Sequence, residues 1–314
     1  MPFSLYTPEM TLISLQDSAR QELSLIYLEA EATALVRQLT AHFTGYASYQ
    51  LIAYGDRPVS VELFEKLSAG LRRLAAGEPL QYITGSTDFY GMHLQVGPGV
   101  LIPRPETEEL VDWIVRDYGQ QRRIGLEGHL SGPDAPAQFP RILDLGTGSG
   151  AIALGLKKGI PEAEVTGIDI SEQALEIARC NALLNKLEVS FSRHDLLAGP
   201  DSGPSLLNTE AGTLDLIVSN PPYVLEAEKD LMRNNVLEFE PHLALFVPDI
   251  DPMRFYRPIA DFAAKALTPR GLLYFEINEA FEAETRETLA VAGFTDIVTR
   301  NDLQGKARMM RAGR

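Results

Sequence analysis

Residues 141–154 constrain the fold of this chain most, because an apolar stretch there enters a glycine-rich turn and then a helical stretch. Gly146 and Gly148 let the backbone turn tightly and approach a ligand closely. Gly150 or Ala151 lets the helix pack on the sheet. The N–H groups at the start of that helix suit an anionic group, such as the carboxylate of a cofactor that carries an amino acid. The segment predicts a nucleotide-binding βα turn.

The cofactor class depends on the acidic residues around this turn, since the glycine spacing also satisfies the dinucleotide fingerprint. Asp144 lies inside the strand, just before the first glycine. Its carboxylate would lie beside a pyrophosphate, whereas it can pair with the ammonium group of S-adenosylmethionine. Charge therefore favours S-adenosylmethionine over NAD.

Two further strand ends carry acidic residues. Asp169 follows the apolar run 165–168, at about the distance beyond the glycines where an acid binds ribose hydroxyls in either cofactor class. It could instead cap the next helix, but Ser171 is the better N-cap, which leaves Asp169 for a ligand. After a third predicted strand, Asp195 could accept from an adenine amino group, with Leu196 against the ring.

The tetrapeptide Asn220-Pro221-Pro222-Tyr223 follows the apolar run 214–218 and indicates the chemistry. The Asn220 side-chain oxygen and the Pro221 carbonyl are two acceptors, and neither proline has an N–H to compete. Pro221 favours an extended Asn220, and the Tyr223 ring can lie against a planar group held between the acceptors. This pattern suits a planar substrate with an NH2 group. Read alone, Asn-Pro-Pro could equally end a strand.

Composition excludes several functional classes. The chain has 28 basic and 43 acidic residues, a net charge of −15, which disfavours non-specific binding to a nucleic acid backbone. The single cysteine, Cys180, allows no intramolecular disulfide and favours the cytoplasm. The five histidines lack metal-ligand spacing, so we expect no metal. No signal sequence and no apolar run of about 18 residues is present, so we expect no membrane contact.

Hydrophobic periodicity and the positions of glycine and proline divide the rest of the chain into segments. Residues 8–75 are expected to be helical, with 20–42 as the clearest helix. Residues 79–103 indicate a β-hairpin, and Pro105 begins a helix. The segments 119–140 and 200–213 are expected to be mobile surface loops without chemistry. Further elements are expected at 253–267 (helix), 272–277 (strand), 280–292 (helix), and 295–300 with 307–311 (hairpin).

This order of elements predicts an α/β fold with a Rossmann-like, seven-stranded, mostly parallel sheet, which binds ligands at the carboxyl ends of its strands. Asp144, Asp169, Asp195 and Asn220 all fall at or near such ends.

Four segments together resemble the release factor glutamine methyltransferases, and the resemblance spans roughly residues 20–311. They are Asp-Leu-Gly-Thr-Gly-Ser-Gly at 144–150, Asn-Pro-Pro-Tyr at 220–223, Pro-Leu-Gln-Tyr-Ile-Thr-Gly at 79–85 and Val-Leu-Ile-Pro-Arg-Pro-Glu-Thr-Glu-Glu-Leu at 100–110. The Pro-Arg-Pro-Glu-Thr-Glu stretch separates this family from DNA and RNA amino-methyltransferases. It also has a simpler interpretation as the start of a helix.

The resemblance implies N5-methylation of the glutamine in the Gly-Gly-Gln loop of peptide chain release factors, with S-adenosylmethionine as donor. It implies a helical substrate-recognition domain at 1–78, a β-hairpin linker at 79–104 and a class I methyltransferase domain at 105–314. It assigns substrate binding to Asn220, Pro221, Pro222 and Tyr223. It assigns cofactor binding to Gly146, Thr147, Gly148, Ser149, Gly150, Asp169, Leu196 and Asn220. The long loops and the sequence at 276–279 depart from the family pattern and leave the edges of the substrate surface open.

Two alternatives remain at this point. One is a nucleic-acid amino-methyltransferase acting on adenine N6 or cytosine N4, against which the net charge and the lack of a target-recognition domain weigh. The other is a non-catalytic protein that senses S-adenosylmethionine or a nucleotide, against which the intact tetrapeptide weighs.

Overall fold

The computed structural model describes residue 7 and residues 9–127, 139–197 and 211–314. These residues form two compact units. The first unit comprises the described residues up to Gly85 together with Arg233–Phe239, and the second comprises those of Ser86–Met232 and Glu240–Arg314. In these parts of the chain, no helix is long and apolar enough to cross a membrane.

The first unit is helical, as expected for residues 8–75. Its elements are α1 (Leu12–Leu23), α2 (Glu29–Thr44), α3 (Ser48–Ala53), α4 (Val61–Ala75), α5 (Leu80–Thr84) and α9 (Asn234–Phe239). The side chains of Thr11 and Ser60 cap α1 and α4 by accepting from backbone N–H groups three residues on. The core of the unit consists mainly of buried leucines from α1, α2 and α4.

The expected continuous helix at 20–42 is wrong, because the chain breaks between α1 and α2. Leu23 and Ala32 are both fully buried in the same core, and α1 packs against α2, so the chain must turn back between the two helices. An unbroken helix would instead extend over about 33 Å and expose one of its halves. The Tyr27 hydroxyl donates to the Leu74 carbonyl at 2.8 Å and anchors the connection.

The segment Arg233–Phe239 is distant in sequence from the rest of the first unit but belongs to it. Arg233 forms a 3.0 Å ion pair with Glu31 of α2. Phe239 lies over Gly77, where an added Cβ would be 3.9 Å from its ring. The first unit is therefore discontinuous in sequence.

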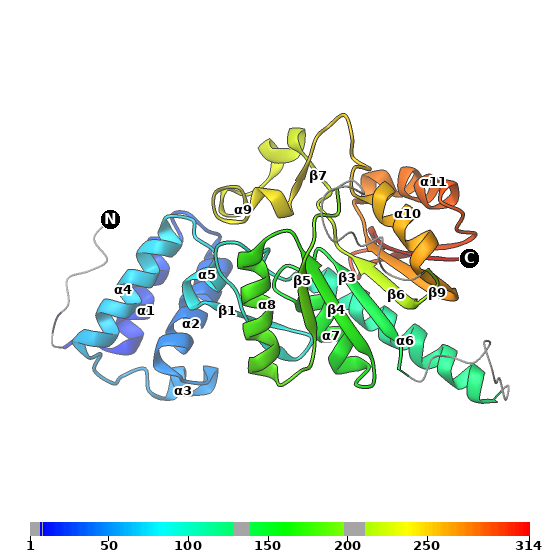
Figure 1. Ribbon diagram of the computed structural model, residues 1–314. Helices are drawn as coiled ribbons and strands as arrows, with labels where there is room; N and C mark the ends of the chain where they lie inside the picture. The colour runs from blue at the N-terminus through cyan, green and yellow to red at the C-terminus, as the bar shows by residue number, and fades with distance from the viewer. Residues whose placement is uncertain (1–6, 8, 128–138, 198–210) are drawn as a thin grey trace. The chain divides into compact units, whose positions relative to one another are not determined.

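The second unit contains the predicted seven-stranded sheet (Figure 1). Its strands are β3 (Arg141–Leu145), β4 (Glu164–Asp169), β5 (Ser190–Arg193), β6 (Leu214–Ser219), β9 (Leu267–Glu276), β10 (Asp296–Asn301) and β11 (Ala307–Gly313). They lie in the order β10-β11-β9-β6-β3-β4-β5. β11 runs opposite to the other six strands, which confirms a mostly parallel sheet. The strand order reverses between β3 and β6.

The register of the parallel strands aligns their carboxyl ends. Leu145 of β3 pairs with Ile168 of β4 on one side and with Ser219 of β6 on the other. Ser219 in turn pairs with Phe275 of β9. The residues that follow these four are, in order across the sheet, Asp169, Gly146, Asn220 and Glu276. Four candidate functional positions thus leave the sheet at one level.

Helices cover both faces of the sheet (Figure 1). One core includes residues of α6 (Pro105–Glu127) and α7 (Ala151–Gly159), and the other includes residues of α10 (Tyr256–Ala266) and α11 (Glu282–Val291). Neighbouring strand residues alternate between the two cores, as Ile142 and Leu143 do. The hairpin predicted at 79–103 is shorter, because the start of this range forms α5 and the hairpin consists of β1 (Ser86–Phe89) and β2 (Met92–Gln95). It packs into the first core.

Smaller elements complete the second unit. They are α8 (Glu172–Asn185), β7 (Val224–Leu225), η3 (Glu226–Leu231), η4 (His242–Ala244), β8 (Phe246–Val247) and η5 (Glu279–Phe281). The predicted N-cap of α8 is confirmed, since the Ser171 hydroxyl accepts from the Ala174 N–H.

The expected loop at 119–140 is partly wrong, because α6 continues to Glu127. A glycine inside a helix costs about 1 kcal/mol, and the Gln and Arg residues after Gly119 are good helix formers. The first turns of α6 are also anchored by the buried Leu110 and Ile114. Residues 128–138 and 200–210 of the two expected loops lie outside the described residues.

Asn181 of α8 joins three parts of the second unit and is expected to be important for stability. It is fully buried, its Oδ1 accepts from the Gln95 N–H at 2.6 Å, and its Nδ2 donates to the carbonyls of Gln95 and Ser149. Asn181→Ala removes three bonds and should lower the free energy of unfolding by about 3 kcal/mol in urea titrations.

Asn185, one turn later and half-buried, is the matched control. Its Nδ2 donates to the carbonyls of His93 and Asn181. Asn185→Ala should cost no more than about 1 kcal/mol, because water can replace these bonds. Equal losses in the two variants would contradict the role assigned to Asn181.

Candidate functional site

The glycine-rich turn between β3 and α7 leaves open space beside its backbone. Gly146, Gly148 and Gly150 all adopt positive φ angles, of 76°, 54° and 82°. A Cβ added at Gly146 or Gly148 would meet no atom within 4 Å. At Gly150 it would lie 3.1 Å from Cβ of Ala178, so this glycine allows α8 to pack closely. The first two glycines thus present the turn to a ligand, and the third provides the packing.

Asp144 lies beneath this turn and is fully buried. Its Oδ2 accepts from the Thr147 hydroxyl at 2.6 Å and from the Ala153 N–H, at the start of α7, at 3.1 Å. Its Oδ1 has no hydrogen-bond partner within the described chain. Burial raises the pKa of Asp144 to about 7, although the two bonds oppose the shift. The side chains of Thr147 and Ser149 are also buried, so the turn offers mainly its backbone to a ligand.

Asp169 ends β4 and lies beside the turn. Its Oδ2 accepts from the Gly148 N–H and its Oδ1 from the Ser171 N–H, both at 2.9 Å. Each carboxylate oxygen can accept more than one bond, so both remain able to bind hydroxyl groups. The structure thus fixes the orientation of this carboxylate through backbone donors.

Asp195 and Leu196 follow β5, at the edge of the sheet. The Asp195 side chain is exposed, and its Oδ1 accepts from the Leu197 N–H at 2.8 Å. Leu196 is half-buried and packs against the second core. These residues therefore lie at the expected strand end, two strands away from β3.

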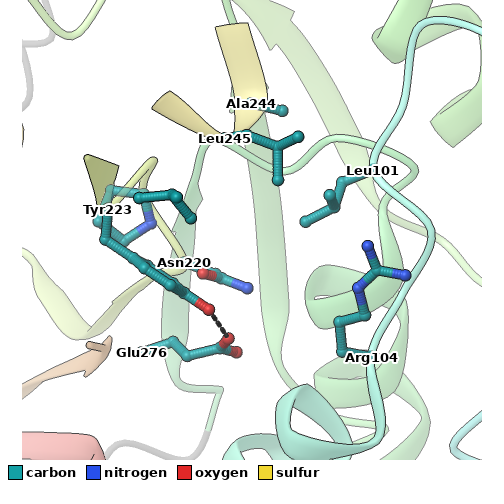
Figure 2. Close-up of a pocket in the computed structure, with 9 residues that line it drawn as sticks. Leu101, Arg104, Asn220, Tyr223, Ala244, Leu245 and Glu276 are labelled. Atoms are coloured by element: carbon teal, nitrogen blue, oxygen red, sulfur yellow. Dashed lines mark hydrogen bonds between the residues drawn. The ribbon is translucent and has the colours of Figure 1, made fainter. Parts of the chain in front are cut away.

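A small pocket lies where β6 ends and the tetrapeptide begins (Figure 2). Its lining residues are Leu101, Arg104, Asn220, Pro221, Tyr223, Val224, Ala244, Leu245 and Glu276. The Ser219 hydroxyl donates to the Leu145 carbonyl at 2.7 Å and ties the end of β6 to the end of β3. The pocket and the glycine-rich turn therefore begin on adjacent strands that this side-chain hydrogen bond holds together.

Glu276, at the end of β9, is the buried centre of this pocket. Its Oε1 accepts from the Tyr223 hydroxyl at 3.0 Å, as Figure 2 shows, and its Oε2 accepts from the Thr107 hydroxyl at 2.7 Å. Burial raises the pKa of Glu276, and these two hydroxyls oppose the shift. Burial also raises the pKa of Tyr223, which therefore keeps its proton. Asn220 Nδ2 lies 3.4 Å from the Thr107 oxygen.

A second buried carboxylate, Glu240, fixes the opposite wall of the pocket. Its Oε1 lies 2.6 Å from Nη2 of Arg104, and its Oε2 accepts from the Ile102 N–H at 3.0 Å. In Figure 2 the Arg104 side chain lies across the pocket from Tyr223. The ion pair neutralises the guanidinium and holds the segment before α6 in place.

The sequence prediction did not include Arg104, Thr107, Glu240 or Glu276 among the site residues. The sequence contains a local pattern that indicates three of these four residues. Arg104 and Thr107 lie in the Pro-Arg-Pro-Glu-Thr-Glu segment that marks the family, and Glu276 ends an apolar strand in the same way as Asp169. For Glu240 no local pattern indicated burial.

Comparisons with known proteins agree with these motifs. Two family models match the chain, the PrmC N-terminal domain over residues 14–85 and the methyltransferase small domain over residues 133–239. The release factor glutamine methyltransferase of Bacteroides thetaiotaomicron is 41% identical over 94% of this chain and 97% of its own. That of Flavobacterium psychrophilum is 43% identical over 77% of both chains.

Among solved structures, the chain is also similar to the protein-(glutamine-N5) methyltransferase (release factor-specific) from Alicyclobacillus acidocaldarius. It is 24% identical, with a TM-score of 0.38, over 70% of this chain and 98% of that chain.

The raised pKa of Asp144 predicts a pH-dependent stability. Between about pH 4 and pH 7 the native state retains a proton that the unfolded state has released, so raising the pH disfavours folding. Relative to Asp144→Asn, the wild-type free energy of unfolding should fall across this range by up to about 4 kcal/mol. Urea titrations of both proteins from pH 4 to 8 measure this difference.

The asparagine variant is a suitable reference because its amide oxygen can still accept from Thr147 and Ala153. A difference between the two proteins that stays constant with pH would contradict the buried, protonated Asp144.

Proposed function

This chain belongs to the release factor glutamine methyltransferase family, and on that premise we propose that it methylates N5 of the glutamine in the Gly-Gly-Gln loop of peptide chain release factors, with S-adenosylmethionine as the methyl donor. A substrate from the translation machinery places the proposed reaction in the cytoplasm.

The register of β3, β6 and β9 supports this proposal more than any other observation. It puts the first glycine of the turn next to Asn220, and Asn220 next to Glu276. A donor bound at the turn and a planar amide bound at the tetrapeptide would therefore lie side by side. Transfer of a methyl group needs this proximity, because alignment of the reacting atoms supplies much of the rate enhancement.

The residues around the turn fit S-adenosylmethionine. The open space beside Gly146 and Gly148 admits a ligand close to the backbone. Asp169 can accept from ribose hydroxyls. Pairing of Asp144 with an ammonium group requires that its carboxylate is ionised and that its buried, unpartnered Oδ1 becomes accessible. Asp195 and Leu196 would face the adenine. In the described ranges no cluster of three or more His, Cys, Asp or Glu side chains could hold a metal ion.

When bound, S-adenosylmethionine supplies an activated methyl group on a sulfonium centre. The tetrapeptide does the rest by positioning. Asn220 Oδ1 and the Pro221 carbonyl accept the two N–H groups of the glutamine amide, and the Tyr223 ring lies against its plane. As the bond from the amide nitrogen to the methyl carbon forms and the carbon–sulfur bond of the donor would break, the nitrogen becomes positive, and its N–H groups donate more strongly to these acceptors. One of these protons then leaves to water, which restores a neutral amide. The acceptors therefore stabilise the transition state more than the bound substrate.

Asn220→Ala tests this mechanism. Loss of an acceptor that strengthens in the transition state should lower the single-turnover rate about 100-fold or more, by analogy with removal of one oxyanion-hole donor. The measurement is mass spectrometry of an intact release factor incubated with enzyme and S-adenosylmethionine. Asn301→Ala, at an exposed asparagine of the edge strand β10, should stay within about twofold of wild type.

The same assay separates the competing functions. An intact release factor should react far better than a short Gly-Gly-Gln peptide, because remote binding energy is used at the reacting centre. A factor whose loop glutamine is replaced by alanine should remain unmodified. Methyl groups on DNA or RNA would instead support an amino-methyltransferase, and near-normal rates in Asn220→Ala would make the tetrapeptide merely structural.

Asp169→Ala tests the cofactor assignment. Loss of two charge-assisted bonds to ribose hydroxyls should weaken S-adenosylmethionine binding by about 2 to 4 kcal/mol in calorimetry. Asp215 is a matched control, because its Oδ2 accepts from the Arg141 N–H at the opposite end of β3 and β6. Asp215→Ala should leave the affinity unchanged. Tighter binding of NAD than of S-adenosylhomocysteine by the wild type would refute the assignment.

A further inference from the structure

Thr107 connects the Pro-Arg-Pro-Glu-Thr-Glu segment to the reactive end of β6. It lies in the first turn of α6 and is 4% exposed. Its hydroxyl donates to Glu276 Oε2 at 2.7 Å, and Asn220 Nδ2 donates to the same hydroxyl oxygen at 3.4 Å. The three side chains come from α6, β9 and the end of β6, and they form a chain of hydrogen bonds.

The direction of this chain follows from the chemistry of its last member. A carboxylate only accepts hydrogen bonds, so the single Thr107 proton is committed to Glu276. The Thr107 oxygen can then only accept, and the part of the Asn220 amide that faces it must be the NH2 group. Asn220 makes no other side-chain hydrogen bond to the described part of the chain. Its amide orientation is therefore set by Thr107.

We propose that Thr107 and Glu276 are positioning residues that hold the Asn220 amide with its oxygen facing the substrate. This proposal rests on the proposed function, in which that oxygen accepts an N–H of the glutamine. A flipped amide would turn its NH2 group toward the NH2 group of the substrate. The acceptor would be lost, and the donor would oppose the positive charge that develops on the nitrogen.

Glu276 also holds the opposite side of the substrate position. Its Oε1 accepts from the Tyr223 hydroxyl, while Asn278 Nδ2 donates to the Tyr223 carbonyl at 3.2 Å. One buried carboxylate thus orients both the acceptor amide and the ring expected to cover the substrate. Each Glu276 oxygen accepts from one of these hydroxyls, so we expect Glu276 to act through Thr107 and Tyr223.

Thr107→Val tests the positioning role of Thr107, because valine keeps the shape of threonine and lacks the hydroxyl. Its turnover number should fall about tenfold or more, the effect of about one lost hydrogen bond in the transition state, while affinity for S-adenosylhomocysteine in calorimetry stays unchanged. Thr107→Ser restores the hydroxyl and should recover most of the activity. If valine is not accommodated, Thr107→Ala removes the same hydroxyl without added bulk and should give the same loss.

Thr285 provides the matched control. It is fully buried in α11, and its hydroxyl donates to the Phe281 carbonyl at 2.8 Å. Thr285→Val makes the same chemical change at equal burial and should leave turnover unchanged. A turnover loss in Thr285→Val as large as that in Thr107→Val would overturn the proposal.

The double variant Asn220→Ala with Thr107→Val shows whether Thr107 acts through Asn220. If it does, the double variant loses no more activity than Asn220→Ala alone. Two outcomes would overturn the positioning role of Thr107 and leave the proposed function intact. In the first, the activity losses of the two single variants multiply in the double variant. In the second, Thr107→Val turns over within twofold of wild type while Asn220→Ala is strongly impaired. Full activity of Asn220→Ala would overturn the proposed function and the positioning role together.

Discussion

The parallel register across β4, β3, β6 and β9 determines where Asp169, the glycine-rich turn, Asn220 and Glu276 lie. Hydrogen bonds between neighbouring strands fix Ile168, Leu145, Ser219 and Phe275 at one level. The residue after each of them leaves the sheet at the same edge. A shift of the register by one residue would exchange the faces of a whole strand, and the two apolar cores prevent this. Packing of the two cores thus fixes the positions of the candidate functional residues at this edge of the sheet.

Buried carboxylates then link the segments around this edge. Asp144 joins β3 to the glycine-rich turn and α7. Glu240, which follows α9, joins its own segment to Ile102 and Arg104 before α6. Glu276 joins β9 to α6 and to the tetrapeptide. Each of them accepts two or more hydrogen bonds, which offsets the cost of burial. Such an environment suits a cationic methyl donor and an amide nitrogen that becomes positive.

The sequence predicted those parts of the site that depend on local pattern. Glycine spacing and a strand followed by Asn-Pro-Pro are visible within a few residues, and the alternation of elements predicted the sheet. The contribution of Thr107 depends on β9, which lies far along the chain, and Glu240 depends on a loop more than a hundred residues earlier. No local pattern contains such pairings. The break after Leu23 was missed for the same reason, because no glycine or proline marks it and only tertiary packing requires it.

The discontinuity of the first unit has a consequence for the order of events during synthesis. Arg233–Phe239 emerges from the ribosome only after four of the seven strands of the sheet have been made. Its contact residues Glu31 and Gly77 lie near the start of the chain and are made much earlier. The helical bundle therefore reaches its full set of contacts late. A nascent chain stalled before this point would hold an incomplete bundle and an unfinished sheet at once, so the two units are expected to mature together.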